Sequence, residues 1–523
     1  QASLAQPTII VIGAGVAGRT VSTLLDTMRR PENPMKNAFK IEVFDRKTNL
    51  ADSPPYCHLH AGGILYTSRI TQTEADKLLE QCIEFTQTYP HCISFRPSVI
   101  AVRKGYSGCS PHQLVERCQN LKETYTRLVA DDPAKQVLGS PSTYYKSYSL
   151  RQLSLVCFDS AGKLKPSVST PYSLDDWMIN WMQQGIKLDT LVFPIVLVQE
   201  FGVSHLRETA SFGLTYREHI KRMTELNIGP ENPQWNMHLG VEVLAISQIP
   251  DTAQWEVSYR SKSGAVKKCV GDYIINAAGP GSGLIDDQLG KPSRRSCEFK
   301  ATYFVKLNER EADFPIPESG YLGSRSTDVD TAMPPYVQVA YYGGGIYQLH
   351  VMTEQVTLFA NGLSSSKLPN SQPEGPAALQ QFYGNFEIEA NKRALEAIRQ
   401  TAEIQSNFES GGCLVGRPLY GLQSILGENI ELRSAGALEY KAAASMPIVK
   451  GVSAVSAAKE VIGFISTYFA ARGVDYTVAE LLSCDPELHT AVSERLAETL
   501  QLPKEAVDLW PQLSVPLTLN PRL

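Results

Sequence analysis

Gly13, Gly15 and Gly18 have the spacing of a loop that holds a dinucleotide. The loop follows a short β-branched run at residues 8–12 and precedes a segment of helical composition at residues 19–29. The first glycine permits a tight turn, the second lets the backbone approach a pyrophosphate, and the third lets the helix pack closely on the strand. The amino end of the helix then faces the phosphates. The predicted contact residues are Gly13, Gly15, Val16, Ala17 and Gly18.

An acidic residue follows the second expected strand, at residues 40–44. Asp45 and Arg46 are the predicted contact residues here, and an acid at the position of Asp45 accepts hydrogen bonds from an adenosine ribose. It lies slightly later in the chain than the motif usually requires, because residues 31–34 form a Pro-rich loop insertion, which costs little. Strand, glycine turn, helix, strand and acid therefore favour dinucleotide binding. The alternative is a structural glycine turn with an empty site.

Three later segments supply further candidate cofactor contacts, and small residues in the first of them would let the chain pass close to a cofactor. Residues 271–281 are expected to form a buried strand that ends in a small-residue turn, and residues 238–246 form a strand upstream, followed by a hairpin partner. A third segment, residues 432–437, precedes a predicted helix at residues 454–471, whose amino end is suited to negative charge. The candidate contact residues in these segments are Val243, Ala278, Gly279, Gly436, Gly451, Val452 and Ser453.

Together these segments resemble the FAD-dependent D-amino-acid oxidase-like superfamily of flavoproteins. It includes glycine and sarcosine oxidases, dimethylglycine dehydrogenase, glycerol-3-phosphate dehydrogenase and, more distantly, malate:quinone oxidoreductase. The resemblance covers the cofactor motifs well and the substrate motifs poorly. It implies an FAD-dependent oxidoreductase with an α/β (α+β overall) fold, in which a Rossmann-like nucleotide-binding domain is built from discontinuous segments.

The segment at residues 57–66 also resembles this superfamily. It is similar to the His-Ala-Ala-Gly-Leu segment of dimethylglycine dehydrogenase relatives and to the His-Gly-Gly segment of glycerol-3-phosphate dehydrogenase. In the former, the histidine carries the flavin covalently through its 8α-methyl group, and His60 is the matching position. The resemblance leaves two alternatives open, a covalent link at His60 or an unbonded His60 that lines the pocket. The cofactor-contact residues that it implies are His58, His60, Ala61, Gly62 and Gly63.

Cys413 is a rival attachment point, because monomeric sarcosine oxidases bond their flavin to a cysteine in a comparable position. The surrounding residues 411–418 lack the rest of that pattern. We therefore expect Cys413 to be a buried structural cysteine.

Catalysis on a flavin asks little of the protein, because N5 accepts the hydride and the chain only orients the substrate, excludes water and removes a proton where needed. Arg417 could hold a substrate carboxylate by a bidentate fork, or it could form an ordinary ion pair. His350 could act as the base, or it could be a hydrogen-bonded structural residue. Residues 333–338 lack the histidine and arginine of malate:quinone oxidoreductases, which argues against malate as substrate.

The expected strands and helices divide the chain into interleaved domains. We assign residues 1–90, 206–295 and 408–475 to the FAD-binding domain. Residues 91–205 and 296–407 form the substrate domain, and residues 476–523 a helical tail. An antiparallel sheet is expected in the substrate domain, with a hairpin turn at the glycines of residues 343–345. Its expected strands are residues 299–307, 336–342, 346–352 and 355–359.

Composition limits the classes of function. The chain has 523 residues, 49 Lys and Arg, 54 Asp and Glu, and a net charge of −5, so it offers no broad basic field for nucleic acid. Its 10 cysteines are scattered without a C-x-x-C pair, and we predict no metal site. No apolar run reaches the roughly 20 residues that cross a bilayer. A cytoplasmic protein is expected, with peripheral membrane contact and a removed export signal left open.

These observations predict an enzyme that transfers a hydride to flavin N5 from a C–H next to nitrogen or oxygen. The substrate is a small, carboxylated molecule such as an amino or hydroxy acid, and the electron acceptor is oxygen or quinone. One alternative is a membrane-associated 2-hydroxy-acid:quinone dehydrogenase. An alternative of another class is a non-catalytic flavin-binding or assembly protein.

Overall fold

The structure is a computed structural model that describes most of the chain. The described residues are 6–48, 70–94, 96–203, 208, 212, 215–216, 219–221, 223–225, 234–293, 295–308, 314–323, 336–353, 356, 384–416, 418–427 and 436–476. The predicted tail, apart from residue 476, lies outside them.

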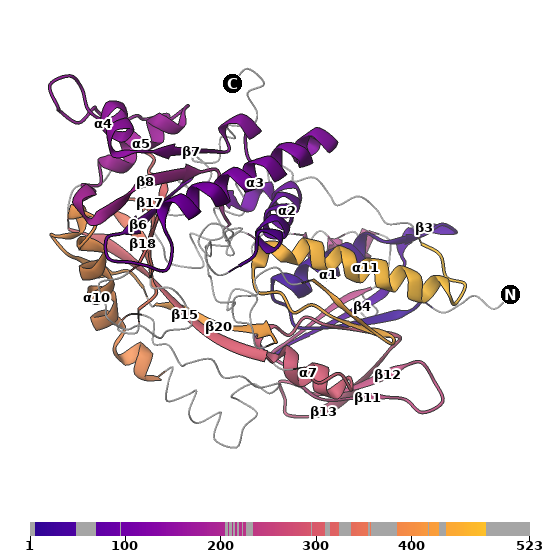
Figure 1. The fold of residues 1–523 in the computed structure, drawn as a ribbon. Helices are drawn as coiled ribbons and strands as arrows, with labels where there is room; N and C mark the ends of the chain where they lie inside the picture. Colours follow the sequence, from indigo (N-terminus) through magenta and orange to yellow (C-terminus); the bar gives the residue numbers. More distant parts are fainter. Residues whose placement is uncertain are drawn as a thin grey trace.

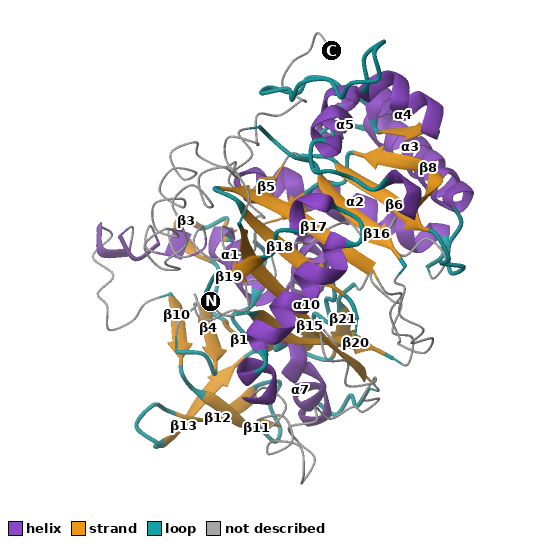
Figure 2. Ribbon diagram, turned by 90° about the vertical axis from the view of Figure 1, so that its left-hand side faces the viewer, coloured by secondary structure: helices purple, strands orange, loops and turns teal. Residues whose placement is uncertain are grey.

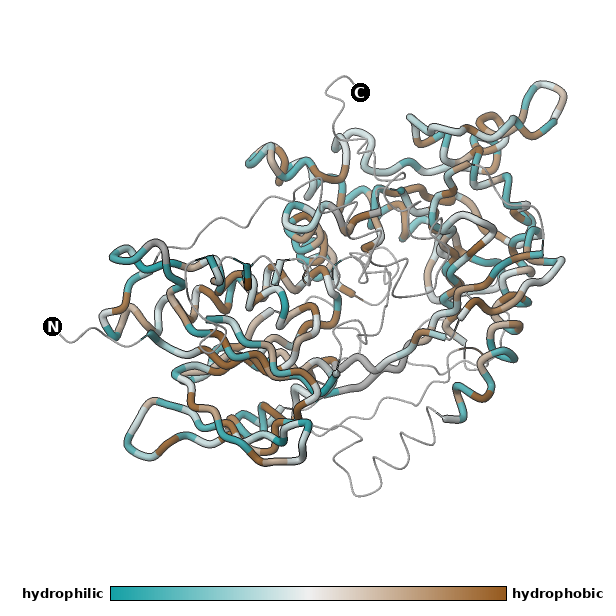
Figure 3. Tube along the Cα trace, turned by 180° about the vertical axis from the view of Figure 1, so that it is seen from behind, coloured by the Kyte–Doolittle hydropathy of each residue, from teal (hydrophilic) through white to brown (hydrophobic). Residues whose placement is uncertain are grey.

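A six-stranded sheet forms the first body, and its strand order is β10-β4-β1-β14-β22-β21. All neighbouring pairs are parallel except β21 and β22. Such a sheet is buried on both faces, which explains the continuous apolar run of β1. Figure 3 shows the hydrophobic colouring of these strands. The strands are β10 (Trp235–Leu239), β4 (Lys40–Asp45), β1 (Thr8–Ile12), β14 (Tyr273–Asn276), β22 (Ala443–Ser445) and β21 (Leu438–Tyr440).

Different elements cover the two faces of this parallel sheet (Figure 1). Helices α1 (Val16–Thr27) and α11 (Ala454–Ala470) pack together on one face. The other face carries a short helix and an antiparallel three-stranded sheet. These elements are α7 (Ser282–Gln288), β11 (Glu242–Gln248), β12 (Trp255–Arg260) and β13 (Val266–Gly271).

A nine-stranded mixed sheet forms the second body. Its order is β19-β15-β18-β17-β16-β6-β8-β7, and β20 pairs with β15. Within this sheet, β6 and β16 are the only described neighbours that pair in parallel. Figure 1 shows β15 and β20 running between the two bodies as a ribbon. The strands are β6 (Ser98–Arg103), β7 (Tyr145–Tyr148), β8 (Leu191–Val198), β15 (Arg295–Leu307), β16 (Glu318–Leu322), β17 (Tyr336–Gly343), β18 (Ile346–Val351), β19 (Gly412–Leu414) and β20 (Leu419–Leu426).

Helices pack on both faces of the mixed sheet. On the outer face, α4 (Leu150–Cys157), α5 (Leu174–Met182) and α10 (Ala390–Ala402) enclose a large apolar core. Figure 2 shows α10 crossing in front of the sheet. On the inner face, α2 (Gln72–Thr88) and α3 (Pro111–Asp131) pack near β6 and β8. The inner face is turned toward the parallel-sheet body (Figure 1).

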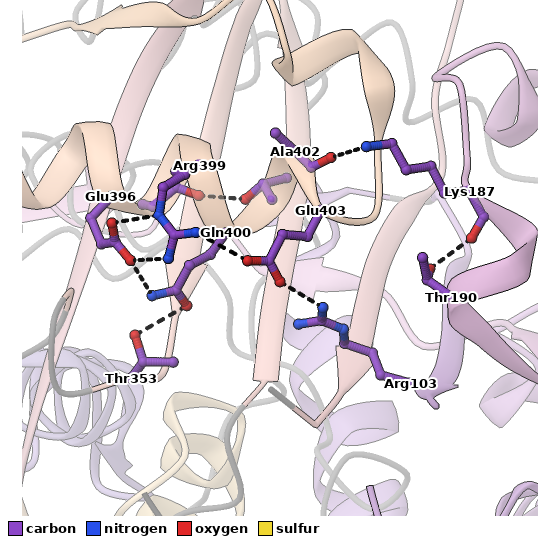
Figure 4. Close-up of polar contacts among 11 residues, drawn as sticks. Arg103, Lys187, Thr190, Thr353, Glu396, Arg399, Gln400, Ala402 and Glu403 are labelled. Atoms are coloured by element: carbon purple, nitrogen blue, oxygen red, sulfur yellow. Dashed lines mark hydrogen bonds and ion pairs between the residues drawn. The ribbon is translucent and has the colours of Figure 1, made fainter. Parts of the chain in front are cut away.

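Polar contacts fasten the end of α10 to the mixed sheet (Figure 4). Glu403 accepts a hydrogen bond of 2.9 Å from Arg103, the last residue of β6, and one of 3.1 Å from Arg399. Glu396 accepts from Arg399, and this hydrogen bond lowers the pKa of Glu396. The network holds the helix over the outer core.

Several expectations need correction. Residues 238–246 are not one strand, because Gly240 has a φ of +69° and separates β10 from β11, which lie in different sheets. The Pro-rich insertion contributes to a short hairpin of β2 (Arg29–Arg30) and β3 (Asn33–Asn37). Val356, from the expected strand at residues 355–359, is helical. Cys413 is exposed rather than buried, because β19 lies at the edge of its sheet.

None of the helices in the described ranges is long and apolar enough to cross a membrane.

Glu42 of β4 gives the parallel sheet a dependence on pH. Burial raises its pKa, but hydrogen bonds from His238, Lys40 and Asn236 outweigh burial, so the pKa is lowered overall. A carboxylate with a lowered pKa stabilises the folded state above its unfolded pKa, and that contribution disappears as the pH falls through the folded value. We expect Glu42→Gln to reduce the free energy of unfolding by about 1–3 kcal/mol at neutral pH. Urea unfolding measures this, and the difference should shrink in acid; a difference independent of pH would contradict the assignment.

Candidate functional site

The predicted glycine loop lies where β1 ends and α1 begins. A Cβ added at Gly13, whose φ is +104°, would lie 2.2 Å from the carbonyl oxygen of Ala277. A Cβ at Gly18 would lie 1.8 Å from the carbonyl oxygen of Gly13. Both positions therefore require glycine for close packing of the protein itself. The loop is thereby held against the carboxyl end of β14, the neighbouring parallel strand.

Gly15 behaves differently from the other two glycines. Its backbone is extended, with φ −73° and ψ −175°, a conformation that any residue adopts. A Cβ added there would meet nothing within 4 Å among the described residues. Gly15 is also the N-cap of α1, and in the described chain no side chain caps this helix. The space beside Gly15 thus adjoins the first N–H groups of α1, which no described side chain caps. This arrangement fits the pyrophosphate of a dinucleotide.

Asp45 lies at the carboxyl end of β4, beside the loop. Its Oδ2 accepts a hydrogen bond of 2.6 Å from the Ala14 N–H, and its Oδ1 accepts one of 2.8 Å from the Lys47 N–H. A carboxylate has about four lone-pair positions, so two contacts leave capacity for ribose hydroxyls. Arg46, the next residue, is exposed. The carboxylate thus braces the loop as well as offering acceptors to a ligand.

The later cofactor segments lie on different elements around the parallel sheet, with α11 on one face and β11 on the other. Gly13 packs against Ala277 and Ala278, and Gly279 follows with a φ of +55°. The other predicted contacts come from different elements. Val452 lies in the same apolar cluster as Val16. The Ser453 Oγ donates a hydrogen bond of 2.5 Å to Gln81 of α2. Gly436 packs against Glu460 of α11. Val243 lies at a bulge of β11, and Gly451 is buried before α11.

His350 lies on β18, far along the chain from the glycine loop. Its strand neighbours Leu349 and Val351 belong to the outer core, so alternation places His350 on the inner face of the mixed sheet. Gln338 of β17 is its cross-strand partner, and the ring of Tyr336 lies 5.5 Å away. His350 is therefore a candidate that faces the parallel-sheet body.

Other polar side chains share this inner face. The Tyr342 hydroxyl donates a hydrogen bond of 2.7 Å to Gln348. The Gln348 amide in turn donates one of 3.0 Å to Thr302. Glu318 accepts a hydrogen bond from Gln338. These five side chains are buried. Buried polar side chains are uncommon among the apolar strands of a sheet, and those that occur are normally hydrogen-bonded.

His350 was a candidate from the sequence, but the inner-face residues Thr302, Glu318, Gln338 and Gln348 were missed, although a signal was present. Gln338 and Gln348 occupy alternate positions in otherwise apolar strands, which marks a polar face. Arg96 also escaped notice; it is buried before β6, donates to the Tyr341 carbonyl and lies 5.5 Å from the Tyr342 ring. Arg96 thus places a positive charge beside the inner face.

Some predicted site residues lie outside the described chain. They are His58, His60, Ala61, Gly62, Gly63 and Arg417. Their roles stay predictions. Among the described residues, no cluster of histidine, cysteine and acidic side chains has the arrangement of a metal site.

Comparison with known proteins places the fold. No model of a known protein family matches the chain, and no curated protein matches it. The L-amino acid deaminase from Proteus vulgaris is similar over 93% of this chain and 96% of its own, with a TM-score of 0.51 and 10% identity. The L-amino acid deaminase from Proteus myxofaciens, in complex with anthranilate, is similar over 89% of this chain and 90% of its own. The TM-score is 0.50 and the identity is 11%. The mixed α/β fold of this chain is therefore similar to the fold of these two deaminases.

Proposed function

We propose that the protein is an FAD-dependent oxidoreductase that takes a hydride from a C–H next to nitrogen or oxygen of a small carboxylated molecule. The observation that carries this proposal lies at Gly15, where a Cβ would meet no described atom within 4 Å. Gly15 is at the amino end of α1, which no described side chain caps, and at the carboxyl edge of a parallel sheet. Ligands of open α/β sheets bind at this edge. The fold shared with two amino acid deaminases supports the same conclusion.

In this proposal the parallel-sheet body is the FAD-binding domain and the mixed sheet belongs to the substrate domain. The expected division assigned residues 408–475 to the former, whereas β19 and β20 pair with β15 of the mixed sheet. We therefore propose that the FAD-binding domain resumes after β20. The bodies then meet along the β15–β20 ribbon.

Each body contributes distinct groups to the reaction. Bound FAD supplies the hydride acceptor. The glycine loop and the amino end of α1 hold the pyrophosphate, Asp45 accepts from the ribose, and the amino end of α11 favours negative charge on the ring system. The inner face orients the substrate and excludes water from it, while Arg96 or Arg417 holds its carboxylate. His350 removes a proton where the substrate requires it.

The cofactor assignment is tested on the purified protein. We expect a yellow protein whose extracted cofactor has the mass of FAD. Acid precipitation tests the link at His60: colour in the pellet supports a covalent bond, and colour confined to the supernatant rejects it. A protein that neither contains nor takes up FAD would reject the proposed function.

Substrate and acceptor are tested separately. Anaerobic addition of a panel of amino and hydroxy acids should bleach the flavin with at least one compound. Release of peroxide with oxygen uptake then identifies an oxidase, and reduction of a quinone or dye identifies a dehydrogenase. A flavin that no compound in the panel bleaches would favour the non-catalytic alternative.

Replacing His350 tests the role of the inner face. His350→Gln should slow anaerobic flavin reduction by about 100-fold, which is the lower range for loss of a catalytic base, while FAD content stays unchanged. His112→Gln is the matched control, because His112 is exposed on α3. Equal reduction rates for the two variants would remove His350 from the mechanism.

A further inference from the structure

The buried pair of Arg19 and Glu208 has no role in the proposed reaction. Arg19 follows the third glycine of the loop and is 1% exposed, and Glu208 is 2% exposed. Nε of Arg19 donates to Oε1 of Glu208 at 3.1 Å, and Nη2 donates to Oε2. The contact is thus a bidentate fork. Because 189 residues separate the partners along the chain, the tertiary fold and not local sequence creates the pair.

The remaining end of the Arg19 guanidinium reaches the glycine loop. Nη1 donates a hydrogen bond of 2.7 Å to the carbonyl oxygen of Ala14. The N–H of the same residue donates 2.6 Å to Asp45. Both polar backbone groups of Ala14 are therefore held by charged side chains, one on each side. A Cβ added at Gly15, the next residue, would meet no described atom within 4 Å.

The direction of the Ala14 carbonyl decides whether the loop can accept an anion. A carbonyl oxygen carries partial negative charge, so one turned toward a pyrophosphate would repel it. Arg19 binds this oxygen at the buried side of the loop, and Glu208 fixes the guanidinium in place. The carboxylate also balances the charge of Arg19, so the pair is not itself an anion site. The uncapped N–H groups of α1 supply that attraction instead.

Neighbouring groups surround the pair on other sides. The centroid of the Phe212 ring lies 6.0 Å from Cζ of Arg19. The Tyr89 hydroxyl donates a hydrogen bond of 3.1 Å to Thr20, the residue after Arg19. Burial, together with the nearby charge of Glu208, raises the pKa of Tyr89, so its phenol stays neutral. Packing from α1, α2 and the Glu208 segment therefore leaves the fork little freedom to rearrange.

We propose that Arg19 and Glu208 are positioning residues that pre-form the FAD pyrophosphate loop by holding the Ala14 carbonyl away from the ligand. This proposal rests on the proposed function, because it assumes that FAD is the ligand of the loop. It adds a residue pair that the glycine motif does not include. The pair acts through Ala14 and touches no reacting atom.

The test compares FAD affinity with stability. Arg19→Lys keeps the charge beside Glu208 but lacks the fork that reaches Glu208 and Ala14 together. Arg19→Met combined with Glu208→Leu removes both buried charges at once. We expect each variant to raise the Kd of the apo-protein for FAD by about tenfold or more, the loss expected for a hydrogen bond to a charged group. The unfolding midpoint of apo Arg19→Lys should stay close to that of the wild type.

The matched control removes a pair that is remote from the loop. Arg103→Met with Glu403→Leu breaks the contact that fastens α10, and should lower the unfolding midpoint without changing the Kd for FAD. Wild-type affinity in Arg19→Lys and in the double variant would overturn the proposal. A Kd that rises only as the midpoint falls, in the loop and control variants alike, would also overturn it. A wild-type apo-protein that binds no FAD overturns the proposed function instead.

Discussion

Gly15→Val should abolish FAD retention and leave the protein folded. Gly15 has an extended backbone that valine adopts without strain, and its Cβ would meet no described atom within 4 Å. The valine side chain would therefore occupy the space of the pyrophosphate and not the space of the protein. The purified variant should be colourless, and titration of FAD into it should show no saturable binding. Its unfolding midpoint should match that of wild-type apo-protein.

Gly463→Val is the matched control. Gly463 lies in α11 and also has no neighbour within 4 Å of an added Cβ. This variant loses some helix propensity but should keep its FAD. Normal FAD content in Gly15→Val would show that the loop does not hold a pyrophosphate.

Asp286→Ala should lower the free energy of unfolding by about 3–5 kcal/mol, the cost of breaking a buried ion pair. Asp286 is 0% exposed and binds Arg295, which is 2% exposed and begins β15. The Asp286 carboxylate also accepts a hydrogen bond of 2.6 Å from Asn276, the last residue of β14, and one of 3.4 Å from Ser445 of β22. Two further nitrogens of Arg295, Nε and Nη1, have no hydrogen-bond partner among the residues that the structure describes. Removing the carboxylate would therefore strand a buried guanidinium at the junction of the two bodies.

Urea unfolding of the apo-protein measures this loss. Glu242→Ala is the control, because Glu242 pairs with Arg260 and both side chains are about half exposed; we expect a loss of about 1 kcal/mol or less. Asp286→Ala with Arg295→Met should recover part of the stability, since no charge is then left buried. A single variant as stable as the control would show that the pair contributes nothing at this junction.

The local elements of the site could be predicted from the sequence because their causes are local. The β-branched run, the glycine spacing and the helical composition lie within one stretch of the chain, and β1 and α1 form there. The same holds for the hairpin of β17 and β18, where Gly343, Gly344 and Gly345 all have positive φ. Where one residue interrupted a favourable pattern, as Gly240 does, the expectation failed, because a φ is not visible in alternating hydrophobicity.

The residues that surround the loop could not be predicted in this way. Glu208 reaches Arg19 across 189 residues of the sequence, and Asp286 reaches Ser445 across 159, through contacts that depend on how distant segments pack. Alternation along β18 separates His350 from Leu349, but it does not reveal which face turns to the other body. The sequence alone thus determined the glycine loop between β1 and α1, since short-range sterics specify it, and the resemblance of its motifs to a known family indicated the class of fold. Only the tertiary structure decided which charged groups brace that loop and which polar residues share the inner face, because packing across the chain brings them together.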